Sequence, residues 1–242
     1  MSKPEIFLST GALYKAAANK VLQLYETAML EKGRFTIALS GGNTPKKLYE
    51  LLAEPFYSKK INWRSVFVFW SDERCVPLYD KDNNSHMASE ALLDNVDIPK
   101  ENIFRVPVNF EPSKAALQYE QLIKNFFKNK TPAFDLLLLG IGEDGHTASL
   151  FPGTGILDEK KALVKQVYIK EKDSFRITFT VPLINLAKNI LFLISGKEKS
   201  TILGSIFNKP VKKNSFPAQL IRPATGNLFW YLDKAAASQL KL

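Results

Sequence analysis

The sequence predicts a single α/β domain over residues 1–242, in which a mainly parallel, doubly wound sheet is flanked by helices on both faces. Short apolar runs alternate with helical patterns along the whole chain, as they do in successive strand–helix units. The most apolar run, Leu136–Leu139, lies between Asp135 and Gly140. Four leucines are too few for a typical helix and are typical of a strand buried on both faces of a parallel sheet. No repeat or linker indicates a second domain.

Helix and strand patterns alternate in the first half of the chain. Apolar residues recur at three- and four-residue steps in the first segment, and Gly33 is placed to end it. After the next apolar run, Pro45 suits the first position of a helix, with Thr44 as its N-cap. The predicted order is helix 12–32, strand 35–40, a helix from Pro45 through Leu52, strand 66–70, helix 83–95 and helix 115–128.

The second half continues the alternation. Residues 176–181 alternate apolar and polar side chains, which is a strand pattern, and residues 190–194 are continuously apolar. The predicted order is strand 136–139, strand 164–169, strand 176–181, strand 190–194, a helix through Ile202, Leu203 and Ile206, strand 228–232 and a short helix from Lys234.

Composition excludes several classes of protein. Apolar residues make up 45% of the chain, which is ordinary for a soluble globular protein, and no stretch approaches the ~18 apolar residues of a membrane span. A single cysteine, Cys75, allows no internal disulfide, so we expect a reducing compartment, the cytoplasm. The net charge of +9 is scattered rather than clustered. We therefore expect a small anionic metabolite as partner, and neither nucleic acid nor a membrane.

The loop Ser40–Pro45 contains two adjacent glycines between a predicted strand and a predicted helix. Glycines let a backbone turn sharply and approach a ligand, and the amides at a helix start suit a phosphate. A tight turn with no ligand would explain the glycines alone. The added donors of Asn43 and Thr44 favour phosphate binding, although the loop lacks the Gly-Lys-Ser/Thr ending of a Walker loop.

Three charged residues, Asp72, Glu73 and Arg74, follow the strand over residues 66–70. Such a triplet is equally compatible with two interpretations. It could be a solvated loop with a surface ion pair of little energetic value. Alternatively, the Arg74 guanidinium could hold a carboxylate, a phosphate or a developing oxyanion.

The segment Glu143–His146 follows the central strand and contains one of only two histidines. Asp144 and His146 are two residues apart, so they can converge only if Gly145 bends the chain in a turn. A carboxylate beside an imidazole fixes its tautomer and its orientation. Because ligands bind at the carboxyl end of the strands in open α/β sheets, this turn is the predicted catalytic centre.

Arg176 opens a predicted strand, and Lys197 follows Ser195-Gly196 after another. Taken singly, each could be an ordinary exposed cation, but a phosphate held by the glycine loop would give both a function. Cys75 adjoins the charged triplet, yet the alternation along residues 74–77 indicates a small packed residue rather than a nucleophile. Two histidines and one cysteine, widely separated, form no recognisable metal-ligand set.

Taken together, these motifs resemble those of the 6-phosphogluconolactonase family along nearly the whole chain. The most specific is Gly140–Gly153, which reads GIGEDGHTASLFPG. The others are SGGNTP at 40–45, WSDERCVP at 70–77, Asn84 with Met87, Leu92-Leu93, Arg176-Ile177-Thr178 with Pro182 and Asn185, Ser195-Gly196-Lys197, and Pro217-Ala218.

Glucosamine-6-phosphate deaminases, from the same superfamily, resemble the chain in the glycine loop, the Asp-Glu pair and the Asp-Gly-His turn. They carry a glutamate five residues after the histidine that assists sugar ring opening, and this chain has Phe151 there. Hydrolysis of an ester that is already a ring needs only one base and a water. Phe151 therefore favours the lactonase.

The resemblance implies hydrolysis of 6-phospho-D-glucono-1,5-lactone to 6-phosphogluconate, the second step of the oxidative pentose phosphate pathway. It implies that His146 takes a proton from the attacking water, that Asp144 orients the imidazole, and that Arg74 stabilises the tetrahedral intermediate or contacts the phosphate. The implied substrate-binding residues are Gly41, Gly42, Asn43, Thr44, Asp72, Arg176 and Lys197.

No metal or organic cofactor is implied, and we expect a monomer. Two alternatives stay open. One is a glucosamine-6-phosphate deaminase-like isomerase, and the other is a non-catalytic regulator that binds a phosphosugar.

Overall fold

Six parallel strands form the central sheet of the computed structural model, which describes residues 2–208 and 216–241. Their order is β1-β9-β8-β5-β2-β3, and every neighbouring pair runs parallel. The bounds are β1 Glu5–Phe7, β2 Phe35–Leu39, β3 Val66–Trp70, β5 Leu136–Leu139, β8 Asn189–Ile194 and β9 Asn227–Asp233. The prediction of a mainly parallel sheet is confirmed, although β1 was not expected.

Strand β5 lies inside the sheet, between β8 and β2. Each of its four leucines is at most 1% exposed, because helices cover both faces of the sheet there. A continuous apolar run is what such a strand requires. The interpretation of Leu136–Leu139 as a strand buried on both faces is therefore confirmed.

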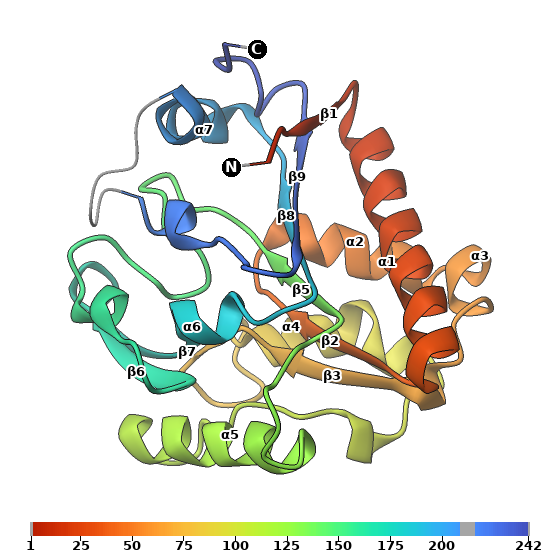
Figure 1. Cartoon of the computed structure of the whole chain (residues 1–242), viewed down its shortest axis with the longest axis vertical. Helices are drawn as coiled ribbons and strands as arrows, with labels where there is room; N and C mark the ends of the chain where they lie inside the picture. The colour runs from red at the N-terminus through yellow and green to blue at the C-terminus, as the bar shows by residue number, and fades with distance from the viewer. Residues whose placement is uncertain (1, 209–215, 242) are drawn as a thin grey trace.

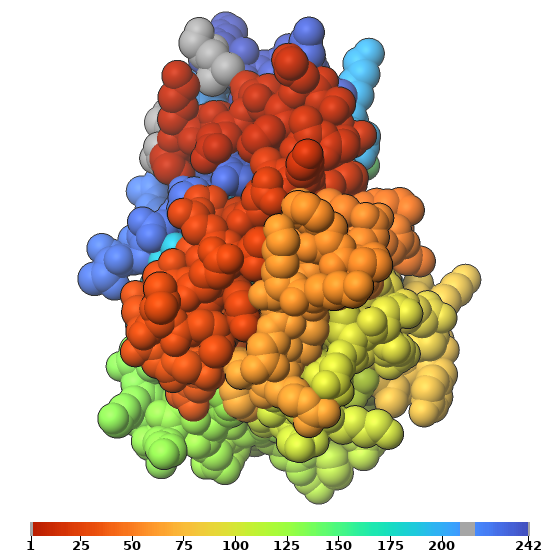
Figure 2. Space-filling model, turned by 90° about the vertical axis from the view of Figure 1, so that its right-hand side faces the viewer, coloured from red at the N-terminus to blue at the C-terminus, as the bar shows by residue number. Residues whose placement is uncertain are grey.

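Helices cover the sheet on both sides, with α1 and α2 on one side and α6 and α7 on the other (Figure 1). Figure 2 shows the face formed largely by the first half of the chain, including α1. The bounds are α1 Thr10–Lys32, α2 Asn43–Ala53, α3 Pro55–Ser58, α4 Asn84–Ala91, α5 Pro112–Phe126, α6 Val181–Ile184 and α7 Ser200–Asn208. Single 3-10 turns occupy Trp63–Ser65, Leu93–Asn95, Lys100–Asn102, Gly155–Asp158, Lys170–Lys172, Lys197–Lys199 and Pro217–Leu220.

The first helix ends where the sequence predicts. Gly33 adopts a left-handed conformation with φ 68°, and its N–H donates to the Met29 carbonyl at 3.0 Å. This is a common way to end a helix, and glycine carries no steric penalty in it. None of the helices in the described ranges is both long enough and apolar enough to cross a bilayer.

A second, antiparallel sheet was not predicted. It has the order β4-β7-β6, with β4 at Asp72–Arg74, β6 at Val164–Ile169 and β7 at Ser174–Phe179. The charged triplet is therefore a short strand rather than a loop. The strand expected over residues 176–181 ends at Phe179, because Thr180 caps α6 and Val181 is its first residue.

The helix expected from Pro45 begins two residues earlier, at Asn43. Gly42 is the N-cap and takes φ 108°, which residues with side chains rarely adopt. Thr44 is therefore inside the helix and is not its cap. Its hydroxyl oxygen lies 3.1 Å from that of Ser195 instead.

Two other helix predictions are wrong, one at its C-terminal end and one altogether. The helix expected over residues 83–95 stops at Ala91, because Leu92 leaves the helical region with φ −142° and a separate 3-10 turn follows. Residues 234–239 form turns rather than the short helix expected from Lys234. There the Asp233 carboxylate accepts the Ala236 N–H at 2.7 Å, as at a helix N-cap, but the bonds from the Ser238 N–H to the Ala235 carbonyl and from the Leu240 N–H to the Ala237 carbonyl span three residues rather than four.

The sheet changes winding direction between β2 and β5. The chain passes from β2 to β3 towards one edge and from β5 through β8 to β9 towards the other. At such a switch point, the connections after two neighbouring strands turn away from each other and leave a crevice at the carboxyl ends. The glycine loop follows β2 and the His146 turn follows β5, so both predicted motifs lie at this crevice.

Candidate active site

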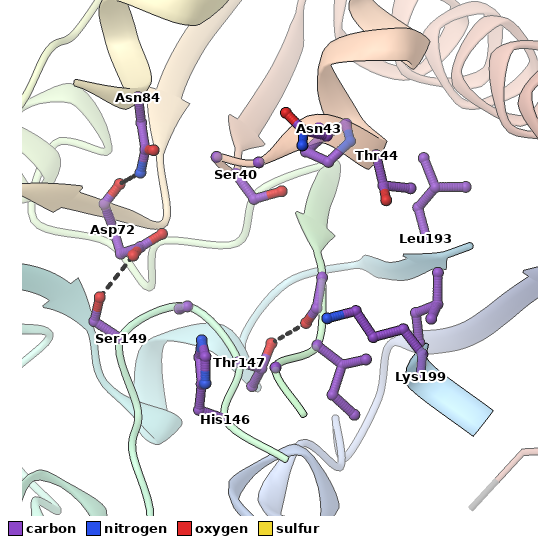
Figure 3. A pocket seen from close by; sticks show the side chains of 18 of the residues that line it. Ser40, Asn43, Thr44, Asp72, Asn84, His146, Thr147, Ser149, Leu193 and Lys199 are labelled. Atoms are coloured by element: carbon purple, nitrogen blue, oxygen red, sulfur yellow. Dashed lines mark hydrogen bonds between the residues drawn. The ribbon is translucent and has the colours of Figure 1, made fainter. Parts of the chain in front are cut away.

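A cavity of about 390 Å³ opens at the carboxyl edge of the sheet (Figure 3). This volume is within the ~300–1,000 Å³ range of small-molecule sites. The connections after four adjacent strands, β8, β5, β2 and β3, contribute to its wall. Eight predicted site residues line it: Gly41, Gly42, Asn43, Thr44, Asp72, Arg74, His146 and Arg176. Asp144 and Lys197 do not.

The turn after β5 brings Asp144 against His146, as its sequence predicts. Gly145 has φ 82°, and its N–H donates to the Gly142 carbonyl at 3.0 Å. The Asp144 carboxylate then lies 2.6 Å from Nδ1 of His146 and also accepts that residue's backbone N–H at 3.1 Å. A Cβ on Gly142 would lie 2.0 Å from the imidazole, so only glycine leaves room for this pairing.

The Asp144 carboxylate assigns the tautomer of the imidazole. Because an ionised carboxylate only accepts hydrogen bonds, Nδ1 carries the proton and Nε2 is left with a free lone pair. Burial alone would raise the pKa of Asp144, but the hydrogen bonds from His146 and its charge lower that pKa below the usual range. Asp144 therefore stays ionised and can stabilise an imidazolium.

Phe151 covers one face of the His146 imidazole. Its ring stacks on the His146 imidazole with centroids 4.0 Å apart and an angle of 19° between the planes. Phe151 also lines the cavity. The position whose residue favours the lactonase in the sequence therefore holds an apolar ring directly against the imidazole.

The N-terminus of α2 forms another part of the wall. The first bond within this helix runs from the Lys46 N–H to the Gly42 carbonyl at 3.1 Å, so the amides of Asn43 and Thr44 precede the intrahelical bonding. These N–H groups and the helix dipole favour an anion. Thr44 is on the cavity side with Ser195, which adds two hydroxyl groups.

Asp72 and Asn84 lie together on the opposite side of the cavity from Thr44 and Lys199 (Figure 3). Asp72 is 8% exposed, and the Ser149 hydroxyl donates to its carboxylate at 2.6 Å. The Asn84 side-chain amide donates to the Asp72 carbonyl at 3.0 Å. This side of the cavity therefore offers mainly oxygen acceptors, which suit sugar hydroxyl groups.

Two arginines are paired on neighbouring strands of the second sheet. Arg74 on β4 is directly opposite Arg176 on β7, and both line the cavity. Burial and, next, the charge of Arg74 lower the pKa of Arg176. Like charges directly opposite on antiparallel strands repel each other, and a bound anion would relieve that repulsion. The interpretation of Arg74 as an anion-binding residue is thus compatible with its surroundings.

The lysine that reaches the cavity after β8 is Lys199, not Lys197. A 3-10 turn over Lys197–Lys199 directs the two side chains differently, and Lys199 extends into the cavity (Figure 3). Lys172, from the turn between β6 and β7, lines the cavity as well. Sequence reasoning missed both, and the only available signal for Lys199 was its position three residues after Gly196.

Neither Glu73 nor Cys75 lines the cavity. Glu73 is 1% exposed, and burial raises its pKa to about 7. Burial, followed by the nearby Glu73 charge, raises the pKa of the Cys75 thiol to about 11. A thiol of that pKa is protonated near neutral pH and is a poor nucleophile. Across residues 2–208 and 216–241, no group of three or more His, Cys, Asp or Glu side chains is arranged to hold a metal ion.

Comparison with known proteins identifies the family and supports the fold. Residues 9–230 match the family described as Glucosamine-6-phosphate isomerases/6-phosphogluconolactonase. The chain is 41% identical over 243 residues to a 6-phosphogluconolactonase of Nostoc sp. and 42% identical over 242 residues to one of Synechocystis sp., with 98% of each chain covered in both cases. The solved structure of the 6-phosphogluconolactonase from Trypanosoma cruzi superposes with a TM-score of 0.86 at 31% identity, covering 100% of this chain and 99% of that one.

Proposed function

Because this chain belongs to the glucosamine-6-phosphate isomerase/6-phosphogluconolactonase family, we propose that it hydrolyses 6-phospho-D-glucono-1,5-lactone to 6-phospho-D-gluconate. Water adds to the lactone carbonyl, the bond from that carbon to the ring oxygen breaks, and the ring oxygen leaves as a hydroxyl group. The open-chain acid then ionises. Nothing except water is consumed, so the reaction needs no redox partner.

The observation that carries this proposal is the pairing of His146 with Asp144. Asp144 holds Nδ1 at 2.6 Å, which leaves Nε2 as the base that takes a proton from the attacking water. The imidazolium so formed returns that proton to the departing ring oxygen. Asp144 stabilises the charged ring between these two steps.

The substrate phosphate is assigned to the N-terminus of α2. The loop Gly41–Thr44 offers amides there, and the Lys199 side chain extends into the same cavity. Arg176 adds further positive charge. The phosphate contact that the sequence assigned to Lys197 is assigned to Lys199 in this proposal, because of these two lysines only Lys199 lines the cavity. Asp72 is assigned to a substrate hydroxyl.

Arg74 is assigned to the negative charge that develops on the carbonyl oxygen in the tetrahedral intermediate. It lines the cavity beside Asp72 on β4, and its Nη1 donates to the Asp82 carbonyl, which restricts where the guanidinium can lie. A positioned donor in a partly buried site stabilises such charge more than water does. Contact of Arg74 with the phosphate is the alternative assignment.

The proposal extends to the setting of the reaction. We assign a monomer of one domain. We further assign a cytoplasmic location, no metal or organic cofactor, and no nucleic-acid or membrane partner. The scattered charge and the single cysteine support these assignments.

Hydrolysis of freshly prepared lactone tests the proposal. The rate with protein should exceed the spontaneous rate in buffer, and a rate equal to the buffer blank would contradict it. A coupled ammonia assay with glucosamine 6-phosphate separates the deaminase alternative, which would release ammonia. Calorimetry with 6-phosphogluconate identifies a regulator, which would bind the product without accelerating hydrolysis.

A further inference from the structure

Glu73 is a buried carboxylate in the middle of the charged strand β4, and the proposed reaction gives it no role. Side chains alternate between the two faces of a strand. Asp72 and Arg74 therefore share the face that lines the cavity, and Glu73 points to the other face. It is 1% exposed, and a carboxylate at such a position requires hydrogen-bond donors.

Three backbone N–H groups supply those donors. The Glu73 carboxylate accepts from Arg74 at 2.8 Å, from Asn84 at 2.7 Å and from Ser85 at 2.8 Å. The first donor belongs to β4, and the other two belong to the first turn of α4. A negative charge at this helix N-terminus is also favoured by the helix dipole. Glu73 therefore joins β4 to the start of α4.

Asn84 extends this connection to the glycine loop. Its side-chain amide donates to the Asp72 carbonyl at 3.0 Å, and this bond is drawn in Figure 3. Its Oδ1 lies so close to Gly41 that a Cβ there would be 1.8 Å away. Asn84 therefore contacts two walls of the cavity, β4 and the loop before α2, and fixes their relative position. Its own backbone N–H donates to Glu73.

We propose that Glu73 is a positioning residue for substrate binding, which acts through Arg74 and Asn84 without touching the substrate. This inference rests on the proposed function, because it assigns substrate contacts to the cavity walls that Glu73 holds. Loss of its hydrogen bonds would release α4 from β4, and the acceptor side of the cavity would no longer match the sugar.

The charge of Glu73 makes this role measurable. Burial raises its pKa to about 7, against the three N–H bonds that lower it. A protonated carboxyl carries an O–H donor in place of an acceptor, so it holds the N–H groups less well. The charged or titratable groups around it are Asp72, Arg74 and Cys75 near its own strand, Tyr119 from α5 and Arg176 from β7. Burial raises the pKa of Cys75 to about 11 and raises that of Tyr119 further, so neither competes near neutral pH.

The test compares the wild type with Glu73→Gln, and uses Glu90→Gln as the matched control on α4. Glu90 is an exposed carboxylate paired with His86, away from the backbone donors. The ratio of wild-type to Glu73→Gln kcat/KM should rise from about pH 6 to about pH 8.5, reaching roughly tenfold through KM, as expected for one charge-assisted hydrogen bond. The ratio cancels pH effects that the two proteins share. A ratio that is constant with pH, or a Glu90→Gln profile that follows Glu73→Gln, would overturn the proposal.

Folding and function are separated by two further measurements. If Glu73→Gln does not give the wild-type circular dichroism spectrum, Glu73→Asp replaces it. The shorter carboxylate should raise KM but keep the pH dependence. Wild-type kinetics in that variant would overturn the proposal. If the wild type fails to hydrolyse the lactone, the proposed function is wrong, and calorimetric Kd values for 6-phosphogluconate decide the inference. A wild-type to Glu73→Gln Kd ratio that changes with pH supports it, and a constant ratio or no binding contradicts it.

Discussion

Charged groups lie near both ends of strand β5, but they are of opposite sign at the amino end and of like sign at the carboxyl end. At the amino end, the buried Asp135 carboxylate lies 2.8 Å from the Lys32 amine and 3.5 Å from that of Lys188, and it accepts the backbone N–H and the hydroxyl of Thr36 at 2.8 and 2.7 Å. At the carboxyl end, Arg74 faces another arginine instead. Within the described part of the chain, the Nε atoms of both arginines are buried without a hydrogen-bond partner.

This difference separates stability from function along one strand. At the amino end, two amines and two donors of Thr36 surround a carboxylate of opposite charge, although in the described residues Oδ1 of Asp135 has only the Lys188 amine at 3.5 Å and no hydrogen bond. Like charges left together at the other end carry a cost that a ligand can remove. Substitutions at the amino end should therefore change unfolding, and substitutions at the carboxyl end should change catalysis.

The largest effect is expected from His146→Ala. General acid–base catalysis by one residue contributes about 10²–10⁴-fold, so kcat should fall by that factor. The unfolding free energy should change by at most about 1 kcal/mol, because the His146–Asp144 pair is partly exposed. Steady-state kinetics and denaturant unfolding measure the two quantities. A variant that retains wild-type kcat would remove His146 from the mechanism.

Asp135→Ala should show the reverse pattern. Removal of this carboxylate leaves Thr36 and two lysines without their acceptor, and should lower the unfolding free energy by about 2–3 kcal/mol. The value is below that of a fully buried pair because both lysines stay partly exposed. Urea unfolding measures it, with Asp135→Asn as a smaller perturbation. A fall in the kcat of the folded variant would break the separation between the two ends.

Lys199 and Lys197 allow a comparison at the carboxyl edge of the sheet between a lysine that lines the cavity and one that does not. Lys199→Ala should raise KM for the lactone roughly tenfold or more, because a charge-assisted hydrogen bond is lost. Lys197→Ala, two residues away, should leave KM within about twofold, as for an ordinary surface substitution. Initial-rate kinetics of the two variants check this. Equal effects, or a larger effect at Lys197, would contradict the assignment of the phosphate contact.

A smaller effect on kcat than that of His146→Ala is expected from Phe151→Leu. An aromatic stack contributes roughly 0.5–1.5 kcal/mol, so kcat should fall by up to about tenfold as the imidazole becomes less well oriented. Phe151→Tyr keeps the ring and should retain most of the rate. If Phe151→Leu has wild-type kcat, the stacking has no part in orienting the base.

Local signals in the sequence are sufficient for the central elements. The run Leu136–Leu139 is typical of a buried strand, and Gly145 permits the turn that joins Asp144 to His146. Gly33 ends α1 for the same local reason. Such features depend on residues within a few positions of one another, and they were therefore predictable.

Features that depend on distant pairing were not predictable. Whether Asp72–Arg74 is a loop or a strand depends on β7, about a hundred residues later in the chain. That pairing sets the facing arginines and turns Glu73 inward. Similarly, a single 3-10 turn decides whether Lys197 or Lys199 extends into the cavity. The direction of each side chain in that turn cannot be deduced from composition.

The most direct test of the central claim is chemical rescue of His146→Ala by imidazole. Removal of the side chain leaves a slot between the Gly142 backbone and the Phe151 ring, next to the Asp144 carboxylate. If His146 is the base, added imidazole should restore lactone hydrolysis in proportion to its concentration, above the rate of imidazole and lactone without protein. A rate equal to that protein-free control at every imidazole concentration would contradict the account.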